Sequence, residues 1–294
     1  MKINSQELKS IINLKVNKEL NFDNLGKLQS KNGKKIVSFL ENEKNLPSLL
    51  LNKSIVAAFT TKKLRKKIKR KMIIIESQKP KYDFGRFHNY LFSETDFYNN
   101  KISWYSEISP TAIINSNNIS SEKVAIGSNT IIETNSVIYS NVKIGENVSI
   151  APNVIIGEQG EFFANKGNSI LRFIFDGGVI IGNNVKIQSM VSIKKGLFGN
   201  STKIASGSTI GSFVNVGHDA NLGKNCYLAP GTIISGSCII GENCFFGVNS
   251  LIKNGIKIGK NCIVGAGSVV TKNVSANSVV VGVPAKVIRK IKKL

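Results

Sequence analysis

The sequence predicts a mainly β protein in which a parallel β-helix follows an N-terminal α/β domain. From residue 204 to 274 an apolar residue returns every six positions, and glycine often follows it. The fifth position of each hexad is small or medium in size. A period of six fits neither the 3.6-residue α-helix nor an alternating strand, but it fits short strands with a turn after each, three to a coil. The apolar positions expected to stack inside the coils are Ile204, Ile210, Val216, Leu222, Leu228, Ile234, Ile240, Phe246, Ile252, Ile258, Val264 and Val270.

Length and composition agree with a packed, two-domain protein. The chain has 294 residues, 41% of them hydrophobic, with 26 glycines, which indicates a turn-rich β protein rather than disorder. It has no run of eighteen apolar residues, and residues 1–20 lack the hydrophobic core of a signal peptide. We therefore expect a cytoplasmic protein without stable membrane insertion.

Four cysteines raise the question of disulfides or a metal site. Cys226, Cys238, Cys244 and Cys262 all occupy the fifth position of a hexad, where small interior residues belong. Buried thiols that act as small hydrophobic groups explain all four, and we predict no metal.

The net charge of +22 is large, and part of it lies in the basic run of residues 62–71. A solvated helix is the favoured interpretation. A nucleic-acid patch is a second, although no aromatic residues interleave with the lysines and no nucleic-acid module is recognisable, so we expect no nucleic-acid partner. A third is electrostatic steering of anionic partners, such as nucleotide phosphates or an acidic carrier protein.

Residues 1–105 lack the hexad pattern and form the expected α/β domain. A helix is predicted over residues 5–14, with Ser5 as its cap, and a second over 84–92. Strands are expected at 35–40, 55–59 and 72–76.

The β-helix is expected over residues 106–278, in about seven coils. Strict sixes run from Ile126 to Ile156, and an excursion over 158–178 interrupts them. The register returns from Ile181 to Ile193 and then slips by one residue before Ile204. Residues 279–294 are predicted to form a C-terminal cap with a short basic helix.

The chain has two histidines. His88, beside Phe87 and Tyr90, is open to a structural or a ligand-stacking role. His218 lies at a turn of its hexad, is expected to project outward, and precedes Asp219. An imidazole at such a corner can act as a general base, and the neighbouring carboxylate can orient it.

Eighteen residues after His218, one coil further on, the same corner is occupied by Gly236. A glycine leaves the backbone uncovered, so its amide N–H can stabilise the oxyanion of a tetrahedral intermediate. His218, Asp219 and Gly236 are therefore the candidate catalytic residues.

These features resemble the left-handed β-helix acyltransferases, the hexapeptide-repeat family. Two branches are similar: UDP-3-O-acylglucosamine N-acyltransferase of lipid A synthesis, over most of the chain, and the acetyl-CoA-dependent N-acetyltransferases of nucleotide-linked amino sugars, from His218 onward. The resemblance implies homotrimers with active sites at clefts between neighbouring coils. The segments that carry it are Ile156-Gly157 to Phe163-Ala164, Val179 to Gly182, Val216 to Asp219, and Gly282 to Lys286.

The resemblance also implies where a nucleotide sugar binds. Residues 37–44 resemble the uridine-binding segment of the lipid A enzymes, which assigns Phe39, Asn42 and Lys44 to the nucleotide. A tyrosine that those enzymes carry next is replaced by Asn45 in this chain.

Two further departures from the lipid A branch concern the acyl donor. A second histidine of that branch is replaced by Asn254, and that branch ends in a helical extension that engages acyl carrier protein, whereas the sequence here stops at Leu294. We therefore expect acyl-CoA, most simply acetyl-CoA, as the donor, with an acyl carrier protein thioester as the alternative. The implied donor-binding residues are Gly236, Asn254, Lys286 and Arg289.

Taken together, the sequence predicts a homotrimeric N-acyltransferase that moves a short acyl group to the amine of a nucleotide-linked amino sugar for surface glycan synthesis. His218 would accept the proton of the attacking amine. The alternatives are a lipid A N-acyltransferase that uses a hydroxyacyl carrier protein, an O-acetyltransferase with the same base, and a β-helix scaffold without catalysis.

Overall fold

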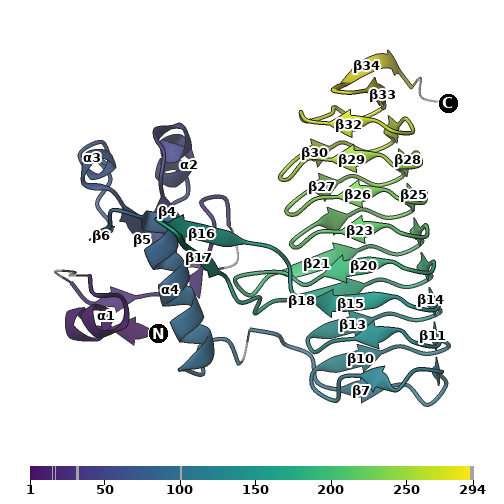
Figure 1. Ribbon diagram of the computed structural model, residues 1–294, viewed down its shortest axis with the longest axis horizontal. Helices are drawn as coiled ribbons and strands as arrows, with labels where there is room; N and C mark the ends of the chain where they lie inside the picture. Colours follow the sequence, from purple (N-terminus) through teal and green to yellow (C-terminus); the bar gives the residue numbers. More distant parts are fainter. Residues whose placement is uncertain (15, 17, 31–32, 100, 292–294) are drawn as a thin grey trace. The chain divides into compact units, whose positions relative to one another are not determined.

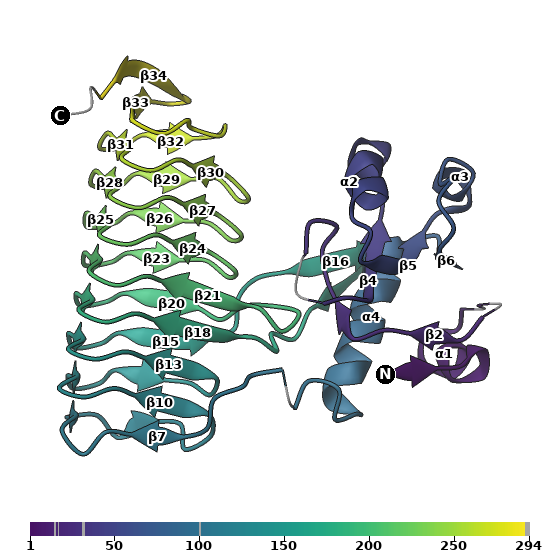
Figure 2. The same cartoon turned by 180° about the vertical axis from the view of Figure 1, so that it is seen from behind.

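The computed structural model describes residues 1–14, 16, 18–30, 33–99 and 101–291. The chain folds into two compact units (Figures 1 and 2). The first comprises Met1–Lys101 and Glu161–Asp176, and the second comprises Ile102–Gly160 and Gly177–Leu294. The chain thus divides after Lys101 rather than after residue 105, and most of the excursion belongs to the first unit.

The second unit is a parallel β-helix with three faces (Figure 1). Each face is a sheet whose strands come from successive coils. The first face holds β7 (Glu107–Ile108), β10 (Val124–Ile126), β13 (Val142–Ile144), β18 (Gly178–Ile181), β21 (Ser201–Ile204), β24 (Asn221–Leu222), β27 (Ile239–Ile240) and β30 (Lys257–Ile258). The second holds β8 (Ile113–Ile114), β11 (Ile131–Ile132), β14 (Ser149–Ile150), β19 (Lys186–Ile187), β22 (Thr209–Ile210), β25 (Tyr227–Leu228), β28 (Phe245–Phe246) and β31 (Ile263–Val264). The third holds β9 (Asn118–Ile119), β12 (Val137–Ile138), β15 (Ile155–Glu158), β20 (Ser192–Lys194), β23 (Asn215–Val216), β26 (Ile233–Ile234), β29 (Leu251–Ile252) and β32 (Val269–Val270).

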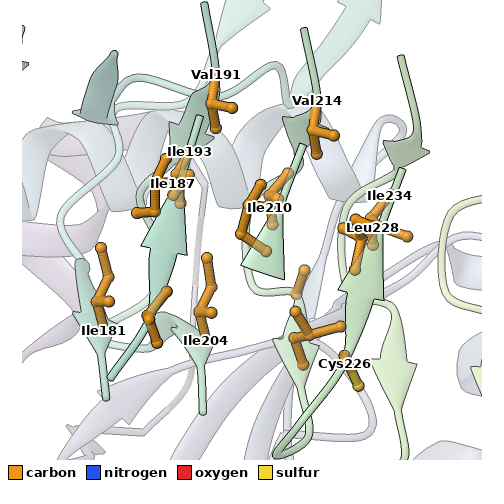
Figure 3. Close-up of a cluster of buried hydrophobic side chains, with 14 of the residues drawn as sticks. Ile181, Ile187, Val191, Ile193, Ile204, Ile210, Val214, Cys226, Leu228 and Ile234 are labelled. Atoms are coloured by element: carbon orange, nitrogen blue, oxygen red, sulfur yellow. The ribbon is translucent and has the colours of Figure 1, made fainter. Parts of the chain in front are cut away.

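The hexad positions face inward, as the sequence predicts. Ile187, Ile210 and Leu228 stack in one ladder, and Figure 3 shows them inside the coils beside Ile193 and Ile234. All of the predicted apolar positions from Ile204 to Val270 are buried. Burial of a large aliphatic side chain stabilises a fold by roughly 1.5–3 kcal/mol, so this continuous ladder is the main stabilising feature of the unit.

The strands are separated by tight turns, many of which place an asparagine at positive φ. Asparagine tolerates this left-handed conformation better than most side chains. At one corner the side-chain amides of Asn225, Asn243 and Asn261 each donate to the Oδ1 of the next asparagine along the column, which ends at Asn277, at 3.4, 3.2 and 2.9 Å.

The four cysteines lie inside the coils, which confirms the prediction that they are interior residues. All four are buried free thiols. The Sγ of Cys238, for example, donates to the carbonyl oxygen of Lys253 at 3.2 Å.

Two expectations about the β-helix are wrong. The register does not slip by one residue before Ile204. Ile193 and Ile204 lie on the consecutive strands β20 and β21, so the 11 positions between them replace the usual six, and the extra residues form a longer turn. The coils also number more than seven, because β7, β8 and β9 already form a coil and the first and third faces hold eight strands each.

The predicted C-terminal basic helix is also wrong. Residues 278–290 form an antiparallel hairpin of β33 (Ser278–Gly282) and β34 (Ala285–Lys290). β33 pairs in parallel with β31 and so extends the second face. Consecutive valines favour a strand over a helix, and β34 covers the hydrogen-bonding edge that β33 would otherwise expose. Residues 292–294 lie outside the described residues.

The first unit contains a four-stranded parallel sheet, and the predicted elements are all present. The sheet order is β3 (Asn24–Leu25), β4 (Ile36–Leu40), β5 (Ile55–Thr60) and β6 (Ile73–Glu76). The helices are α1 (Ser5–Ile12), the 3-10 helix η1 (Glu43–Asn45), α2 (Leu46–Leu51), α3 (Lys62–Arg65) and α4 (Pro80–Ser93), and β1 (Lys2–Ile3) pairs with β2 (Leu20–Asn21). Asn4 rather than Ser5 caps α1, in a reciprocal pair with Glu7. No helix in the described part of the chain is long and apolar enough to cross a membrane.

Helix α4 packs against the excursion, which forms a hairpin of β16 (Phe163–Lys166) and β17 (Ser169–Arg172). His88 of α4 is fully buried there. Its Nε2 donates to the carbonyl oxygen of Ile174 at 2.7 Å, its Nδ1 accepts from the Tyr98 hydroxyl at 2.7 Å, and its ring stacks on Phe173. Of the two roles left open for His88, these contacts support the structural one.

The basic run is not a continuous solvated helix, because α3 ends at Arg65. Arg70 donates to the backbone carbonyls of Leu49, Asn52, Lys53 and Ile55, which ties the end of α2 to β5. Lys67 pairs with Glu43 at 2.6 Å. Part of the run therefore stabilises the first unit.

Candidate active site

His218 lies at the corner that joins the third face of the β-helix to the first. Val216, the last residue of β23, points inward, and Gly217 then turns the chain. The ring of His218 follows the corner toward the next coil, and only 6% of the residue is exposed. The side chain is thus outside the aliphatic ladder, as predicted, but it is more covered than an outward-projecting side chain would be.

Asp219 is held beside His218 by three hydrogen bonds. Its Oδ2 lies 2.9 Å from His218 Nδ1, and its Oδ1 accepts from the Leu197 N–H at 2.9 Å. Its own N–H donates to Thr202 Oγ1 at 2.9 Å. A carboxylate only accepts, so Nδ1 of the neutral ring carries the proton and Nε2 is the basic nitrogen.

Gly236 lies directly against that nitrogen. A Cβ atom placed on Gly236 would lie 2.5 Å from His218 Nε2 and 2.8 Å from Cδ2. The absence of a side chain at Gly236 therefore makes room for the imidazole itself, in addition to leaving the backbone uncovered. Within the described part of the chain, the N–H of Gly236 has no hydrogen-bond acceptor.

One coil further on, Asn254 continues the same column. Its Nδ2 would lie 3.0 Å from a Cβ on Gly236, and Asn254 is exposed. The structure therefore brings together four predicted residues: His218, Asp219, Gly236 and Asn254. Between them they offer a base, its orienting carboxylate, a backbone donor and a side-chain amide.

Lys286 and Arg289 lie further along the β-helix. Both are exposed residues of β34 in the terminal hairpin. Their strand pairs with β33, which follows β31 on the second face, whereas β23, which precedes His218, belongs to the third face. These two residues do not contact His218.

The three residues predicted to bind the nucleotide belong to the first unit. Phe39 of β4 is partly buried and packs against Phe84, with ring centroids 5.0 Å apart. Asn42 and Lys44 are exposed, at the start of η1 and within it.

Two lysines lie near this segment in the same unit. The ammonium groups of Lys27 and Lys81 lie 5.1 and 4.2 Å from the centroid of the Phe162 ring. Burial lowers the pKa of Lys81, Glu41 opposes that effect, and nearby Lys27 adds to it. The sequence pattern gives no sign that these lysines lie together, because the ring of Phe162 belongs to the excursion, far away in the sequence.

Leu197 and Thr202 were likewise missed as partners of Asp219. The one available signal was the irregular spacing before Ile204, which marks the loop that carries Leu197.

Two segments of the chain match known hexapeptide-repeat families. Residues 123–158 match the family described as bacterial transferase hexapeptide (six repeats), and residues 237–272 match hexapeptide repeat of succinyl-transferase. These matches confirm the predicted resemblance and the hexapeptide-repeat β-helix.

Curated relatives include two UDP-3-O-acylglucosamine N-acyltransferases. The protein of Shewanella denitrificans is 34% identical over 83 residues, which is 28% of this chain and 24% of the relative. That of Campylobacter jejuni subsp. doylei is 33% identical over 84 residues, which is 28% of this chain and 26% of the relative. The chain thus matches about a quarter of the length of these relatives.

Solved structures with the same β-helix include two acyltransferases. The UDP-N-acetylglucosamine acyltransferase from Campylobacter jejuni superposes with a TM-score of 0.53 at 22% identity, covering 63% of this chain and 75% of the other. LpxA from Acinetobacter baumannii superposes with a TM-score of 0.50 at 26% identity, covering 63% and 74%. The first likeness concerns the fold alone.

Proposed function

We propose that this protein is a hexapeptide-repeat acyltransferase that transfers an acyl group from a thioester to the amine of a nucleotide-linked amino sugar. The observation that carries the proposal is the corner at which the His218 imidazole, oriented by Asp219, lies against the uncovered backbone of Gly236. The names of the curated relatives support acyl transfer to a nucleotide sugar.

The chemistry follows from the tautomer of His218. Its Nε2 accepts a proton from the sugar amine as the amine nitrogen attacks the thioester carbonyl carbon. The carbonyl oxygen becomes an oxyanion, which the Gly236 N–H stabilises. The intermediate then collapses, the C–S bond breaks, and the proton leaves with the thiol. No covalent enzyme intermediate is needed, because a neutral amine is a competent nucleophile once it is positioned.

The donor is either acyl-CoA or an acyl carrier protein thioester. Asn254 lies beside the reaction corner and can hydrogen-bond the donor arm. The basic hairpin with Lys286 and Arg289 lies at the end of the β-helix and can attract donor phosphates, which favours CoA.

The first unit is the proposed nucleotide-binding unit. Phe39 offers an aromatic surface to a base, and Asn42 and Lys44 are exposed beside it. The ammonium groups of Lys27 and Lys81 can hold the phosphates of the sugar nucleotide.

A second candidate is the N-acylation of a UDP-3-O-(3-hydroxyacyl)glucosamine from an acyl carrier protein in lipid A synthesis. The names of the curated relatives favour it. Both candidates use the same base, and the donor distinguishes them.

The deciding experiment is a thiol-release assay. Acetyl-CoA and a hydroxyacyl carrier protein are each offered with a panel of UDP- and dTDP-linked amino sugars, to the wild type and to His218→Ala. We expect release from acetyl-CoA with at least one acceptor, and a loss of about a hundredfold or more in the variant.

Release only from the carrier protein would establish the second candidate. Release that His218→Ala does not change would refute the assigned base. No release from any pair would favour the β-helix scaffold. Thermal unfolding of the variant controls for its folding.

A further inference from the structure

The β-helix carries an unusual loop, residues 195–200, one coil before His218. Ile193 and Ile204 are 11 positions apart across this corner, whereas Val216 and Leu222 are 6 apart across the same corner of the next coil. Four consecutive loop residues, 195–198, are buried. The backbone groups of an exposed loop can bond to water, but those of a buried loop need hydrogen-bond partners within the protein.

Backbone hydrogen bonds and close packing fix the loop to the neighbouring coil of the β-helix. Gly178 donates to the Asn200 carbonyl at 3.0 Å, and Gly177 and Gly178 exchange hydrogen bonds with Gly196 at 3.1 and 3.0 Å. A Cβ on Gly177 would lie 1.9 Å from the Asn200 oxygen, so only glycine allows this approach. The loop is therefore held in one place.

Phe198 adopts a strained conformation within it. Its φ is 59°, in the left-handed region, and the residue is 1% exposed. Bulky side chains rarely occupy this region, and the cost is roughly 1–3 kcal/mol per residue. Such strain persists where the surrounding structure enforces it, and it often marks a functional loop.

The loop directs one backbone group at Asp219. The Leu197 N–H donates to Asp219 Oδ1, while Oδ2 of the same carboxylate meets His218 Nδ1, both at 2.9 Å. From the other side, Thr202, which is fully buried, accepts the N–H of Asp219 at 2.9 Å. Asp219 itself has a φ of 57°, and the bond to Thr202 helps to hold that conformation.

We propose that the loop 195–200 and the adjoining strand β21 form a positioning element, in which the Leu197 N–H holds the Asp219 carboxylate and Thr202 Oγ1 holds the Asp219 backbone, so that His218 keeps its proton on Nδ1. Leu197 and Thr202 are positioning residues, because neither acts on the substrate itself. The inference rests on the proposed function for its effect on catalysis, but its effect on the tautomer of His218 can be measured without any substrate.

The chain suits this measurement because it has only two histidines. His88 donates from Nε2 to a carbonyl oxygen, so its neutral ring carries the proton on Nε2, the opposite of His218. In ¹⁵N spectra of histidine-labelled protein at mildly alkaline pH, we expect one ring of each tautomer. His88 then serves as an internal reference.

The test variant is Thr202→Val, and Thr130→Val is its matched control. Thr130 is also fully buried, and its Oγ1 accepts the N–H of Val148 from the next coil at 3.2 Å, at a distant position of the β-helix. We expect Thr202→Val to raise the Nε2–H fraction of His218 and to lower kcat about tenfold with little change in KM. Thr130→Val should change neither quantity.

Leu197→Pro removes the N–H itself, and thermal unfolding shows whether this variant keeps its fold. Thr202→Val decides the question if it does not. A wild-type tautomer and kcat in Thr202→Val, or equal changes in Thr130→Val, would overturn the proposal. A shifted tautomer in a protein that acylates no amino sugar would support the positioning role and refute the proposed function instead.

Discussion

Gly236 is as important to the proposed site as His218. Gly236 gives the imidazole its place, because the position of its missing Cβ lies 2.5 Å from His218 Nε2. The same absence leaves the Gly236 N–H available to an oxyanion in the proposed mechanism. The lack of a side chain at Gly236 thus makes room for the base and leaves a donor for the oxyanion of the transition state.

Gly236→Ala should therefore displace the ring of His218. We expect kcat to fall by about a hundredfold, comparable to the loss of a general base. Gly267→Ala is the control, since no atom lies within 4 Å of its added Cβ, although its φ of 63° makes alanine strained there. The control should lose roughly 1 kcal/mol of stability and keep its kcat. An unchanged kcat in Gly236→Ala would contradict the assigned position of the ring.

The sequence was sufficient to bring His218, Gly236 and Asn254 together, because residues eighteen apart stack wherever the period is unbroken. It was insufficient for Leu197, since the loop around it breaks that period and its neighbours depend on how the loop folds back. Thr202 was missed for a related reason: it precedes the hexad position Ile204 and looks like any small interior residue.

Among the secondary-structure elements, α4 and the hairpin β16–β17 illustrate how segments far apart in the sequence make one unit. A Cβ on Gly85 of α4 would lie 2.7 Å from Leu171 of β17 and 2.6 Å from Phe173 just after it, so helix and hairpin approach closely. His88 then joins them through Ile174 and Tyr98. Burial lowers the pKa of His88 from 6.5 to about 4, against the opposing effect of the hydrogen bond to Ile174.

This shift predicts a loss of stability in acid. Because the folded-state pKa is depressed, the neutral form contributes stability that is complete above about pH 6.5 and is lost as the pH falls toward 4, on the order of 3 kcal/mol in all. His88→Gln keeps a side-chain N–H donor but cannot titrate. Calorimetric melting at several pH values should show the wild type losing its advantage over His88→Gln between pH 6.5 and 4. A constant difference would show that His88 is not the titrating group.

The hexad predicted the regular coils of the β-helix, but it could not predict how the coils end. From the sequence alone, the apolar residues of β33 suggest a capping loop, and the basic residues that follow them suggest a solvated helix. In the structure the hydrogen-bonding edge of the last coil decides the outcome, because β34 pairs with β33. Such tertiary pairing is invisible to local patterns.

At the scale of the whole molecule, the outer faces of the β-helix differ in character. The second face exposes Tyr227 and Phe245, whose rings stack at 5.4 Å and lie 4° from parallel. The third face exposes Ile233, and Val248 is exposed at the corner between these two faces. Contiguous exposed apolar side chains mark interaction surfaces.

We expect these surfaces to close a homotrimer, in which the face of one subunit meets a different face of the next. Phe245 on the second face is 44% exposed and is the position to test. Ile239 on the first face is a matched control, because it is similarly exposed, at 47%, but its neighbours on the adjacent strands are the polar residues Asn221 and Lys257.

Sedimentation equilibrium should give three times 32.0 kDa for the wild type and for Ile239→Glu, but a smaller mass for Phe245→Glu, because a buried unpaired carboxylate is costly at an apolar interface. Dissociation by Ile239→Glu alone would assign the contact to the first face. A monomeric wild type would refute the trimer, and the proposed site would then have to be complete in one chain.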